Sequence, residues 1–325
     1  MSVATSLNRA LLTARGRRRR WLGKARDWLI AKGGDPAVDM DVHGRLMSLP
    51  LSHELPFLLR DLPQYDQLPA RLASFTRERD GRLVAIDVGA NVGDTVAAML
   101  ARPDDRFLAI EPAAEFLPYL RANWGSNAQV TILDVACGAA EQTTPMHVES
   151  HGGTASIEAR ADGVPMHVTT VDALLRAHAE FAAANVLKID TDGSDFDVIE
   201  GASGLLAARR PVLLFECADF GAPDYAARCR AAFARLRACG YRHVVVYDNV
   251  GYLMGCFPVE PMWEFEQLLF YQLSSPFKYF DVAAMPDDAL GAFLEREREY
   301  FVAVTVPESL AGMARQIAPQ FGAAR

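Results

Sequence analysis

The stretch AIDVGANVGDT, residues 85–95, decides the fold of this chain. It connects a short apolar run to a helical pattern through two glycines. This order predicts a buried strand at 83–88, a glycine loop, and a helix at about 94–100. Loops of this kind lie at the carboxyl edge of a parallel sheet, where α/β proteins bind their ligands.

The same alternation of apolar runs and helical patterns continues along the chain. Short, continuous, β-branched runs between helices indicate a parallel sheet that is buried on both faces. Right-handed crossovers then give a doubly wound α/β fold with a seven-stranded, Rossmann-like sheet. Besides 83–88, the predicted strands are 107–111, 129–135, 186–190, 212–216, 243–247 and 279–284. The later predicted helices are 114–123, 195–207, 224–238 and 261–273.

The remaining sequence predicts extensions at both ends of this domain. Residues 1–32 form a basic N-terminal helix or arm, and 33–80 form a helical cap or lead-in with a helix at about 65–79. We expect the ligand-binding domain to cover 81–285. Residues 286–325 are expected to form a helical C-terminal extension that starts with a charged surface helix over 286–302.

Charge is unevenly distributed along the chain. The net charge is −8, but residues 1–32 hold nine Arg and Lys against one Asp, so this segment carries +8 and the remainder −16. Together with Trp21 and Trp28, the basic run suits peripheral contact with an anionic membrane through residues 9–32, or contact with nucleic acid. The acidic body argues against nucleic acid as a partner. A solvated arm is the plainest interpretation.

Cysteine usage and hydropathy bear on the compartment. The five cysteines are odd in number and form no CxxC pair, so we expect reduced thiols in a cytoplasmic protein. No uncharged apolar run reaches 18 residues, and the basic start lacks the apolar core of a signal peptide. We therefore expect a cytoplasmic location, or a peripheral one at the inner face of a membrane.

The glycine loop favours a ligand without phosphate. Its spacing, Asp-x-Gly-x-x-x-Gly, departs from the Gly-x-Gly-x-x-Gly fingerprint of dinucleotide-binding loops. S-adenosylmethionine (SAM) is such a ligand, and Asp87 could hold its ammonium group while Gly89 and Ala90 offer backbone contacts. A simple strand-to-helix turn, in which glycines only supply positive φ, is the alternative.

A second carboxylate strengthens this interpretation. Glu111 ends the next predicted strand, where a carboxylate can accept hydrogen bonds from both hydroxyls of a ribose. The turn after the third strand, at Val135 and Ala136, could pair with the edge of an adenine. The candidate cofactor-binding residues are therefore Asp87, Gly89, Ala90, Asn91, Gly93, Thr95, Glu111, Pro112, Val135, Ala136 and Asp190.

The fourth strand ends in an acidic turn, LKIDTDGSD at 187–195. Methyl transfer to an alcohol needs alignment of the reactants and removal of the hydroxyl proton. Asp190, Asp192 or His151 could act as the base. Alternatively, Asp190, Asp192 and Glu216 could hold a divalent cation, although we favour a metal-free site. Ser194 or Asp195 is expected to cap the following helix.

The stretch ESHGGTASI, 149–157, falls in the long connection between the third and fourth predicted strands. Long loops at this edge of a sheet often carry function. We expect a loop here, with His151, Thr154 and Ser156 lining the acceptor pocket.

Several motifs together resemble the FkbM family of SAM-dependent methyltransferases. They are IDVGANVGDT at 86–95, AIEP at 109–112, VACG at 135–138, LKIDTDGSDFDVIEGA at 187–202 and RPVLLFE at 210–216. Many members have Asp-Val-Glu-Gly where this chain has Asp190-Thr191-Asp192-Gly193, so one carboxylate is a methylene shorter here. The resemblance implies O-methylation of a sugar, a surface glycan or another small natural product.

Three other interpretations compete with this one. A nicotinamide-dependent oxidoreductase would share the sheet but needs the missing glycine spacing. A membrane- or anion-binding protein would act through the basic arm. A pseudoenzyme would bind SAM without turnover, and the intact acidic carboxyl edge argues against it. The sequence also offers no hydride-transfer site for an oxidoreductase.

Overall fold

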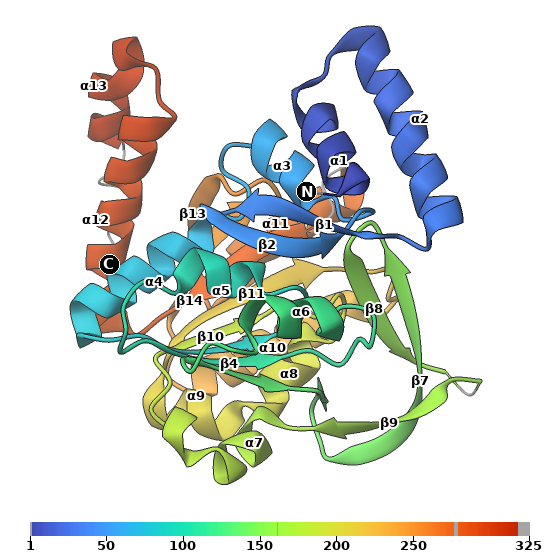
Figure 1. The fold of residues 1–325 in the computed structure, drawn as a ribbon. Coiled ribbons are helices and arrows are strands. Elements are labelled where there is room, and N and C mark those ends of the chain that lie inside the picture. The colour runs from blue at the N-terminus through green and yellow to red at the C-terminus, as the bar shows by residue number, and fades with distance from the viewer. Residues whose placement is uncertain (1, 161, 276–278, 318–325) are drawn as a thin grey trace.

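The computed structural model describes residues 2–160, 162–275 and 279–317, and at its centre lies a twisted eight-stranded sheet (Figure 1). The strand order is β13-β12-β14-β11-β10-β3-β4-β5, and β13 and β14 run opposite to the other six strands. The strands are β3 (Val84–Val88), β4 (Arg106–Ile110), β5 (Val130–Leu133), β10 (Val186–Ile189), β11 (Val212–Ala218), β12 (His243–Asp248), β13 (Leu253–Pro258) and β14 (Tyr279–Ala284).

All seven predicted strands are present in this sheet, and β13 adds an unpredicted eighth at its edge. β13 forms a hairpin with β12. Its sequence, LMGCFP, contains no β-branched residue and includes a glycine and a proline, so it lacks the composition that identifies strands.

Helices cover both faces of the sheet, as a doubly wound fold requires. Alternate residues of each strand enter two separate cores: Ala85 and Phe107 belong to one, Ile86 and Leu108 to the other. The first core includes residues of α4 (Leu68–Asp80), α5 (Asp94–Met99), α6 (Leu117–Trp124) and α12 (Asp287–Val304). The second includes residues of α7 (Val171–Ala177), η1 (Ala179–Phe181), α8 (Asp195–Gly201), α9 (Ser203–Arg209), α10 (Tyr225–Ala238) and α11 (Trp263–Ser274).

The N-terminal region is not purely helical, which corrects the expectation for residues 33–80. Two helices, α1 (Val3–Thr13) and α2 (Gly16–Gly33), precede a β-hairpin of β1 (Ala37–Val42) and β2 (Arg45–Pro50), and α3 (Leu55–Asp61) follows. Val38, Met40 and Val42 are buried while the residues between them are exposed. This period-two pattern, closed by the His43-Gly44 turn, was the available signal for a hairpin.

The expected long loop at 149–157 is also wrong, because most of this stretch is strand. β6 (Ala136–Cys137), β7 (Gln142–His151), β8 (Thr154–Ala159) and β9 (Val164–Thr169) form a second sheet in the order β6-β9-β7-β8. Gly152 and Gly153 form the turn between β7 and β8, both with positive φ. In Figure 1 this sheet projects from the body of the molecule.

The C-terminal extension contains α12 and α13 (Glu308–Ile317). α12 was expected at the surface, but it buries Phe293 and Glu297 against the body. Glu297 forms an ion pair with Arg71 at 2.8 Å and accepts a hydrogen bond from the hydroxyl of Tyr247 at 2.7 Å. In the described part of the chain, no helix has both the length and the apolar character that a membrane span requires.

Candidate functional site

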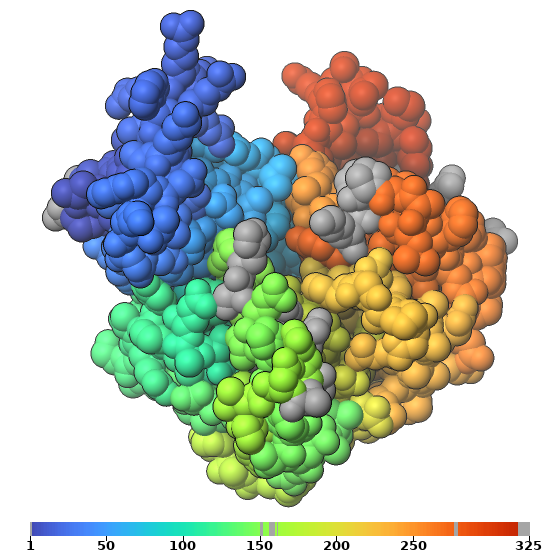
Figure 2. Space-filling view, turned by 90° about the vertical axis from the view of Figure 1, so that its right-hand side faces the viewer, coloured from blue at the N-terminus to red at the C-terminus, as the bar shows by residue number. Residues whose placement is uncertain are grey.

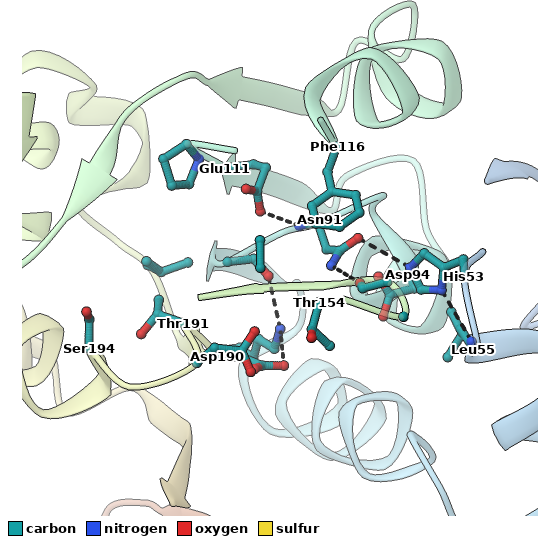
Figure 3. A pocket seen from close by; sticks show the side chains of 18 of the residues that line it. His53, Leu55, Asn91, Asp94, Glu111, Phe116, Thr154, Asp190, Thr191 and Ser194 are labelled. Carbon is teal, nitrogen blue, oxygen red and sulfur yellow. Dashed lines mark hydrogen bonds and ion pairs between the residues drawn. The ribbon is translucent and has the colours of Figure 1, made fainter. Parts of the chain in front are cut away.

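A pocket opens at the carboxyl ends of β3, β4 and β10, at the centre of the sheet (Figure 3). It encloses about 1060 Å³ including its open mouth, a size typical of ligand-binding clefts. Six regions of the chain meet in its wall: the N-terminal segment at His53, the glycine loop, the segment after β4 at Glu111, the segment after β5 at Val135, the β7–β8 turn and the acidic turn after β10. The pocket lies at the edge of the sheet where the sequence predicts the site.

Gly89 brings the glycine loop against the end of β10. Its φ is +83°, and a Cβ atom at this position would overlap the carbonyl oxygen of Asp190. The glycine therefore supplies both positive φ and space, since no side chain fits between the two strand ends. This close approach holds β3 and β10 in register at the pocket floor.

The backbone of this loop is already hydrogen-bonded, which corrects one expectation. The N–H groups of Gly89 and Ala90 both donate to the carbonyl oxygen of Ile110 at 3.0 Å. The N–H of Asn91 donates to a Glu111 carboxylate oxygen at 2.7 Å. None of these three donors is therefore free for a ligand, although Gly89 and Asn91 line the pocket.

Glu111 occupies the pocket wall at the end of β4. Its side chain is buried, with one carboxylate oxygen accepting from Asn91 N–H and the other from Ala113 N–H, both at 2.7 Å. Each carboxylate oxygen has a second lone pair, so the group can still accept hydrogen bonds from the pocket. Burial raises the pKa of Glu111 to about 7, and the two backbone donors oppose this shift.

Next to Glu111, an apolar shelf is formed by the segment that follows β5. Val135, Ala136 and Cys137 line the pocket here, and Phe116 and Met146 complete the apolar part of the wall. A flat apolar ring system could lie against this shelf with its polar edge toward the backbone.

Lys188, which the sequence analysis did not consider, connects two of the predicted carboxylates. Its ammonium Nζ lies 3.3 Å from Asp87 and 3.2 Å from Asp190. Burial opposes ionisation of the lysine, but Asp190 and Asp87 outweigh it and raise its pKa well above the usual value. A lysine inside an apolar strand next to Asp-rich turns was the available signal, because an isolated buried charge needs a partner.

Asp87 itself lies behind the pocket wall. It is 1 % exposed and does not line the pocket, so it is not positioned to hold a ligand's ammonium group as expected. Burial raises its pKa to about 6, against the opposing effect of Lys188. Its place is to neutralise and orient Lys188, while Asp94 and Asp190 are the carboxylates that face the pocket from this side.

At the acidic turn, three carboxylates lie close together at the ends of β10 and β11. Oxygen atoms of Asp190, Asp192 and Glu216 all lie within 4.8 Å of one another, a grouping that could hold a divalent cation. Burial and the nearby charge of Asp190 raise the pKa of Asp192 to about 7 and that of Glu216 well above its usual range. These carboxylates could hold a divalent cation or, without one, accept a proton.

Asp195 organises this turn and does not cap a helix as expected. One of its oxygens accepts from the N–H and hydroxyl of Thr191, at 3.1 and 2.7 Å, and the other from Glu216 N–H at 2.9 Å. Ser194, at the N-cap position of α8, makes no side-chain capping hydrogen bond. Asp195 thus ties the ends of β10 and β11 together and fixes the carboxylates beside it.

His53 joins three distant segments at the mouth of the pocket and was not predicted. Its Nδ1 accepts from Leu55 N–H at 3.2 Å, and its Nε2 lies 3.4 Å from the amide oxygen of Asn91. The amide nitrogen of Asn91 donates to the carbonyl oxygen of Gly153 at 2.7 Å (Figure 3). Burial lowers the pKa of His53, so the ring is neutral at pH 7 and donates through Nε2.

The predicted cofactor-binding and catalytic residues divide into two groups. Gly89, Asn91, Glu111, Pro112, Val135, Ala136, Asp190 and Asp192 line the pocket. Asp87, Ala90, Gly93 and Thr95 lie behind its wall. Gly93 serves packing, because a Cβ there would overlap the ring of Trp124. Thr154 lines the pocket, whereas the side chains of His151 and Ser156 lie outside what the structure describes.

A second groove adjoins the acidic turn on the side away from Glu111. It is lined by Asp192, Glu216, Asp219, Phe220, Leu273 and Tyr279, among others. Asp192 is the residue common to this groove and the pocket, so the two cavities approach each other at the acidic turn.

Comparison with known proteins identifies the domain that carries the site. Residues 87–243 match the family model described as the methyltransferase FkbM domain. The chain carries an FkbM methyltransferase domain. The matched segment starts at Asp87 and extends to the first residue of β12, so it includes the glycine loop, Glu111 and the whole acidic turn. With its doubly wound sheet, the FkbM domain has the class I methyltransferase fold that was predicted.

Solved structures with partial similarity include a methyltransferase FkbM from Methylobacillus flagellatus KT, at 14 % identity and a TM-score of 0.38. The alignment covers 62 % of this chain and 58 % of that one, so the chain spans less than two thirds of that protein's length. Fibrillarin from Aeropyrum pernix, solved with bound S-adenosyl-L-methionine, is 10 % identical with a TM-score of 0.36, over 78 % of this chain and 83 % of that one. No curated protein sequence matches the chain.

Proposed function

We propose that the FkbM domain binds SAM in the pocket and transfers its methyl group to a hydroxyl oxygen of a sugar, glycan or other small natural product. The observation that carries the proposal is the placement of Glu111. Its buried carboxylate lies between the loop held by Gly89 and the apolar shelf at Val135–Cys137, as recognition of an adenosine requires.

The residues present fit the chemistry of this cofactor. Glu111 would accept the ribose hydroxyls, and Val135 and Ala136 would pack against the adenine. Asp94 and Asp190 would face the positive amino-acid end, in place of the buried Asp87. When bound, SAM would supply an electrophilic methyl group on its sulfonium. The thioether S-adenosylhomocysteine would be the leaving group of an in-line displacement.

The acidic turn supports transfer to oxygen because it offers a base at the right edge of the sheet. Asp192 has a pKa of about 7, near the pH at which a general base works best. We infer that Asp192 accepts the proton of the acceptor hydroxyl. Asp190, beside it, forms an ion pair with Lys188 at 3.2 Å.

The groove beside Asp192 fits a polyhydroxylated acceptor. Its carboxylates, Glu216 and Asp219, can accept hydrogen bonds from several hydroxyl groups, while the exposed ring of Phe220 offers an apolar face. An acceptor in this groove would present one hydroxyl to Asp192 at the point where the groove and the pocket approach each other.

Isothermal titration calorimetry tests the cofactor. We expect micromolar binding of SAM and S-adenosylhomocysteine, no binding of NAD, and about 10- to 100-fold weaker binding of both adenosyl ligands to Glu111→Gln, because a charge-assisted hydrogen bond contributes about 1.5–3 kcal/mol. Glu115→Gln is the matched control, since Glu115 is exposed on the following turn and does not line the pocket.

Each arm of this experiment decides a separate point. A preference for NAD would favour the nicotinamide oxidoreductase. Equal weakening by Glu115→Gln would remove the specific role of Glu111. With SAM binding established, a screen of sugars and hydroxylated natural products for methyl incorporation tests the acceptor class, and transfer only to nitrogen or carbon acceptors would contradict O-methylation.

A further inference from the structure

Helix α2 stands apart from the body of the protein and has two unlike faces. None of its 18 residues is buried, and Figure 1 shows it lying outside α1 and the β1–β2 hairpin. In Figure 2 the N-terminal segment projects beyond the rest of the molecule. A helix with no buried residue contributes little to the core, so its sequence is free to serve a surface function.

One face of α2 attaches the helix to the body. Arg26 donates to the carbonyl oxygens of Leu51 and Ser52, at 3.0 and 2.8 Å, and forms an ion pair with Glu54 at 2.8 Å. Leu29 and Ile30, on the same side, pack against the first of the two cores. These contacts fix the rotation of the helix about its own axis.

The opposite face carries a stripe of alternating cations and tryptophans. Positions 17, 21, 24, 28 and 32 repeat at intervals of three and four residues, so they share one side of the helix, away from Arg26. They are Arg17, Trp21, Lys24, Trp28 and Lys32. The side chains of Trp21 and Trp28 are 73 % and 63 % exposed, which is unusual for the largest apolar residue. The ammonium of Lys24 lies 5.9 Å from the ring centroid of Trp21.

Within the part of the chain that the structure describes, the cations of this stripe have no acidic partners. Among the described residues, Arg17, Arg18, Arg20, Lys24 and Lys32 form no ion pair, whereas Arg19 and Arg26 pair with Asp61 and Glu54. The whole chain has a net charge of −8, and residues 1–32 carry +8. The rest of the chain therefore carries −16 and is strongly acidic. A negatively charged surface would therefore be attracted at this stripe and repelled by most of the remaining molecule.

We propose that the outer face of α2, defined by Arg17, Trp21, Lys24, Trp28 and Lys32, docks the protein on an anionic lipid bilayer. Indole rings settle at the boundary between head groups and acyl chains, and flanking Lys and Arg pair with anionic head groups. A duplex nucleic acid would use the cations but would leave the two tryptophans without a matching apolar layer. The proposal does not depend on the reaction proposed above.

Docking in this way would place the pocket near the bilayer. Glu54, the ion-pair partner of Arg26, lines the pocket, and its N–H donates to the carbonyl oxygen of Gly152 in the β7–β8 turn at 3.0 Å. The helix is thus fixed directly to the pocket wall. The two faces of α2 link a membrane surface on one side with the site on the other.

Sedimentation of the full-length protein with phospholipid vesicles tests the proposal. We expect binding to vesicles of phosphatidylcholine mixed with phosphatidylglycerol, little binding to phosphatidylcholine alone, and loss of binding in high salt, where charges are screened within about 3 Å at 1 M. W21A/W28A and, separately, R17E/K24E should each reduce partitioning by at least about tenfold. Both variants should keep the wild-type Tm, because all four side chains are exposed.

Matched controls lie on other helices. Trp263→Ala removes a tryptophan that is 58 % exposed on α11, and Arg237→Glu reverses an exposed charge on α10. We expect both to bind anionic vesicles as the wild type does. The proposal is overturned if the wild type ignores anionic vesicles, if the two α2 variants bind as well as the controls, or if the protein binds duplex DNA or RNA but not lipid.

Discussion

At the scale of the residue, the site depends on a few side chains whose surroundings define what they can do. Glu111, Asp190 and Asp192 are all carboxylates at strand ends, yet they differ in partners. Glu111 is held by two backbone N–H groups, Asp190 by Lys188, and Asp192 has a pKa near 7 because of burial and the adjacent Asp190. One residue type can therefore serve binding, charge and proton transfer in the same pocket.

Gly89→Ala tests the close approach of the glycine loop to β10. A Cβ would meet the Asp190 carbonyl oxygen, so we expect a loss of about 1–3 kcal/mol in unfolding free energy beyond the cost of positive φ, together with loss of SAM binding. Gly81→Ala is the control, because Gly81 has the same positive φ, +85°, with open space around it. It should cost only about 1–2 kcal/mol and leave binding intact. Equal losses in both variants, measured by denaturant unfolding, would contradict the steric argument.

Asp192→Asn tests the proposed base through the pH dependence of methyl transfer. A base works only when it is deprotonated, so kcat/KM should rise with pH through about 7, the pKa of Asp192, and then level off. In Asp192→Asn the rate should fall by about 100-fold or more, and the rise should disappear. Asp197→Asn, which alters a half-exposed carboxylate paired with Arg228, should keep the wild-type profile. An unchanged profile in Asp192→Asn would assign the proton to another group.

At the scale of the element, the strand ends that form the site are held by polar contacts at the carboxyl edge of the sheet. Asp195 connects the ends of β10 and β11, and His53, Asn91 and Gly153 connect the N-terminal segment, the glycine loop and the β7–β8 turn. Such contacts fix the positions of the segments that form the pocket. Secondary structure alone would leave these segments free to move relative to one another.

Arg77→Ala tests how α4 is attached to the sheet. Arg77 pairs with Asp105 at 2.9 Å, and their side chains are 7 % and 0 % exposed, so the variant would leave a buried, unpaired carboxylate. We expect the unfolding free energy to fall by about 3–5 kcal/mol. Arg79→Ala, on the same helix, breaks a pair that is partly exposed on both sides and should cost less than about 1 kcal/mol. Urea unfolding of both variants measures the difference, and similar losses would show that burial of the pair is unimportant.

At the scale of the whole molecule, the pocket is assembled from segments that are far apart in sequence, between His53 and Ser194. These segments pack on two cores, one on each face of the sheet. A ligand that contacts all of them binds only the folded state, so it must stabilise the whole protein.

This linkage predicts a thermal shift. SAM at 100 times its Kd should add about 2.7 kcal/mol to the free energy of unfolding and raise Tm by about 4 °C for a chain of this size. Differential scanning calorimetry with and without SAM measures the shift. NAD at the same concentration should give none, and SAM with Glu111→Gln should add only about 0.4–1.4 kcal/mol, because the same SAM concentration is then only about 1–10 times the Kd. An undiminished shift in Glu111→Gln would mean that SAM binds elsewhere.

The sequence by itself determined the doubly wound sheet, because short, continuous apolar runs and helical patterns are local signals that burial on both faces reinforces. It also located the site at the carboxyl edge, since the glycine loop, Glu111 and the acidic turn each follow a strand. The hairpin at 37–50 and the β7–β8 pair were not predicted, although the first has a clear period-two pattern. Only the tertiary structure decided the partners of each side chain. In the folded chain Asp87 pairs with Lys188, the N–H groups of Gly89 and Ala90 are hydrogen-bonded to the backbone, and His53 lies at the pocket. These contacts join residues that are distant in sequence, so they depend on how the layers pack.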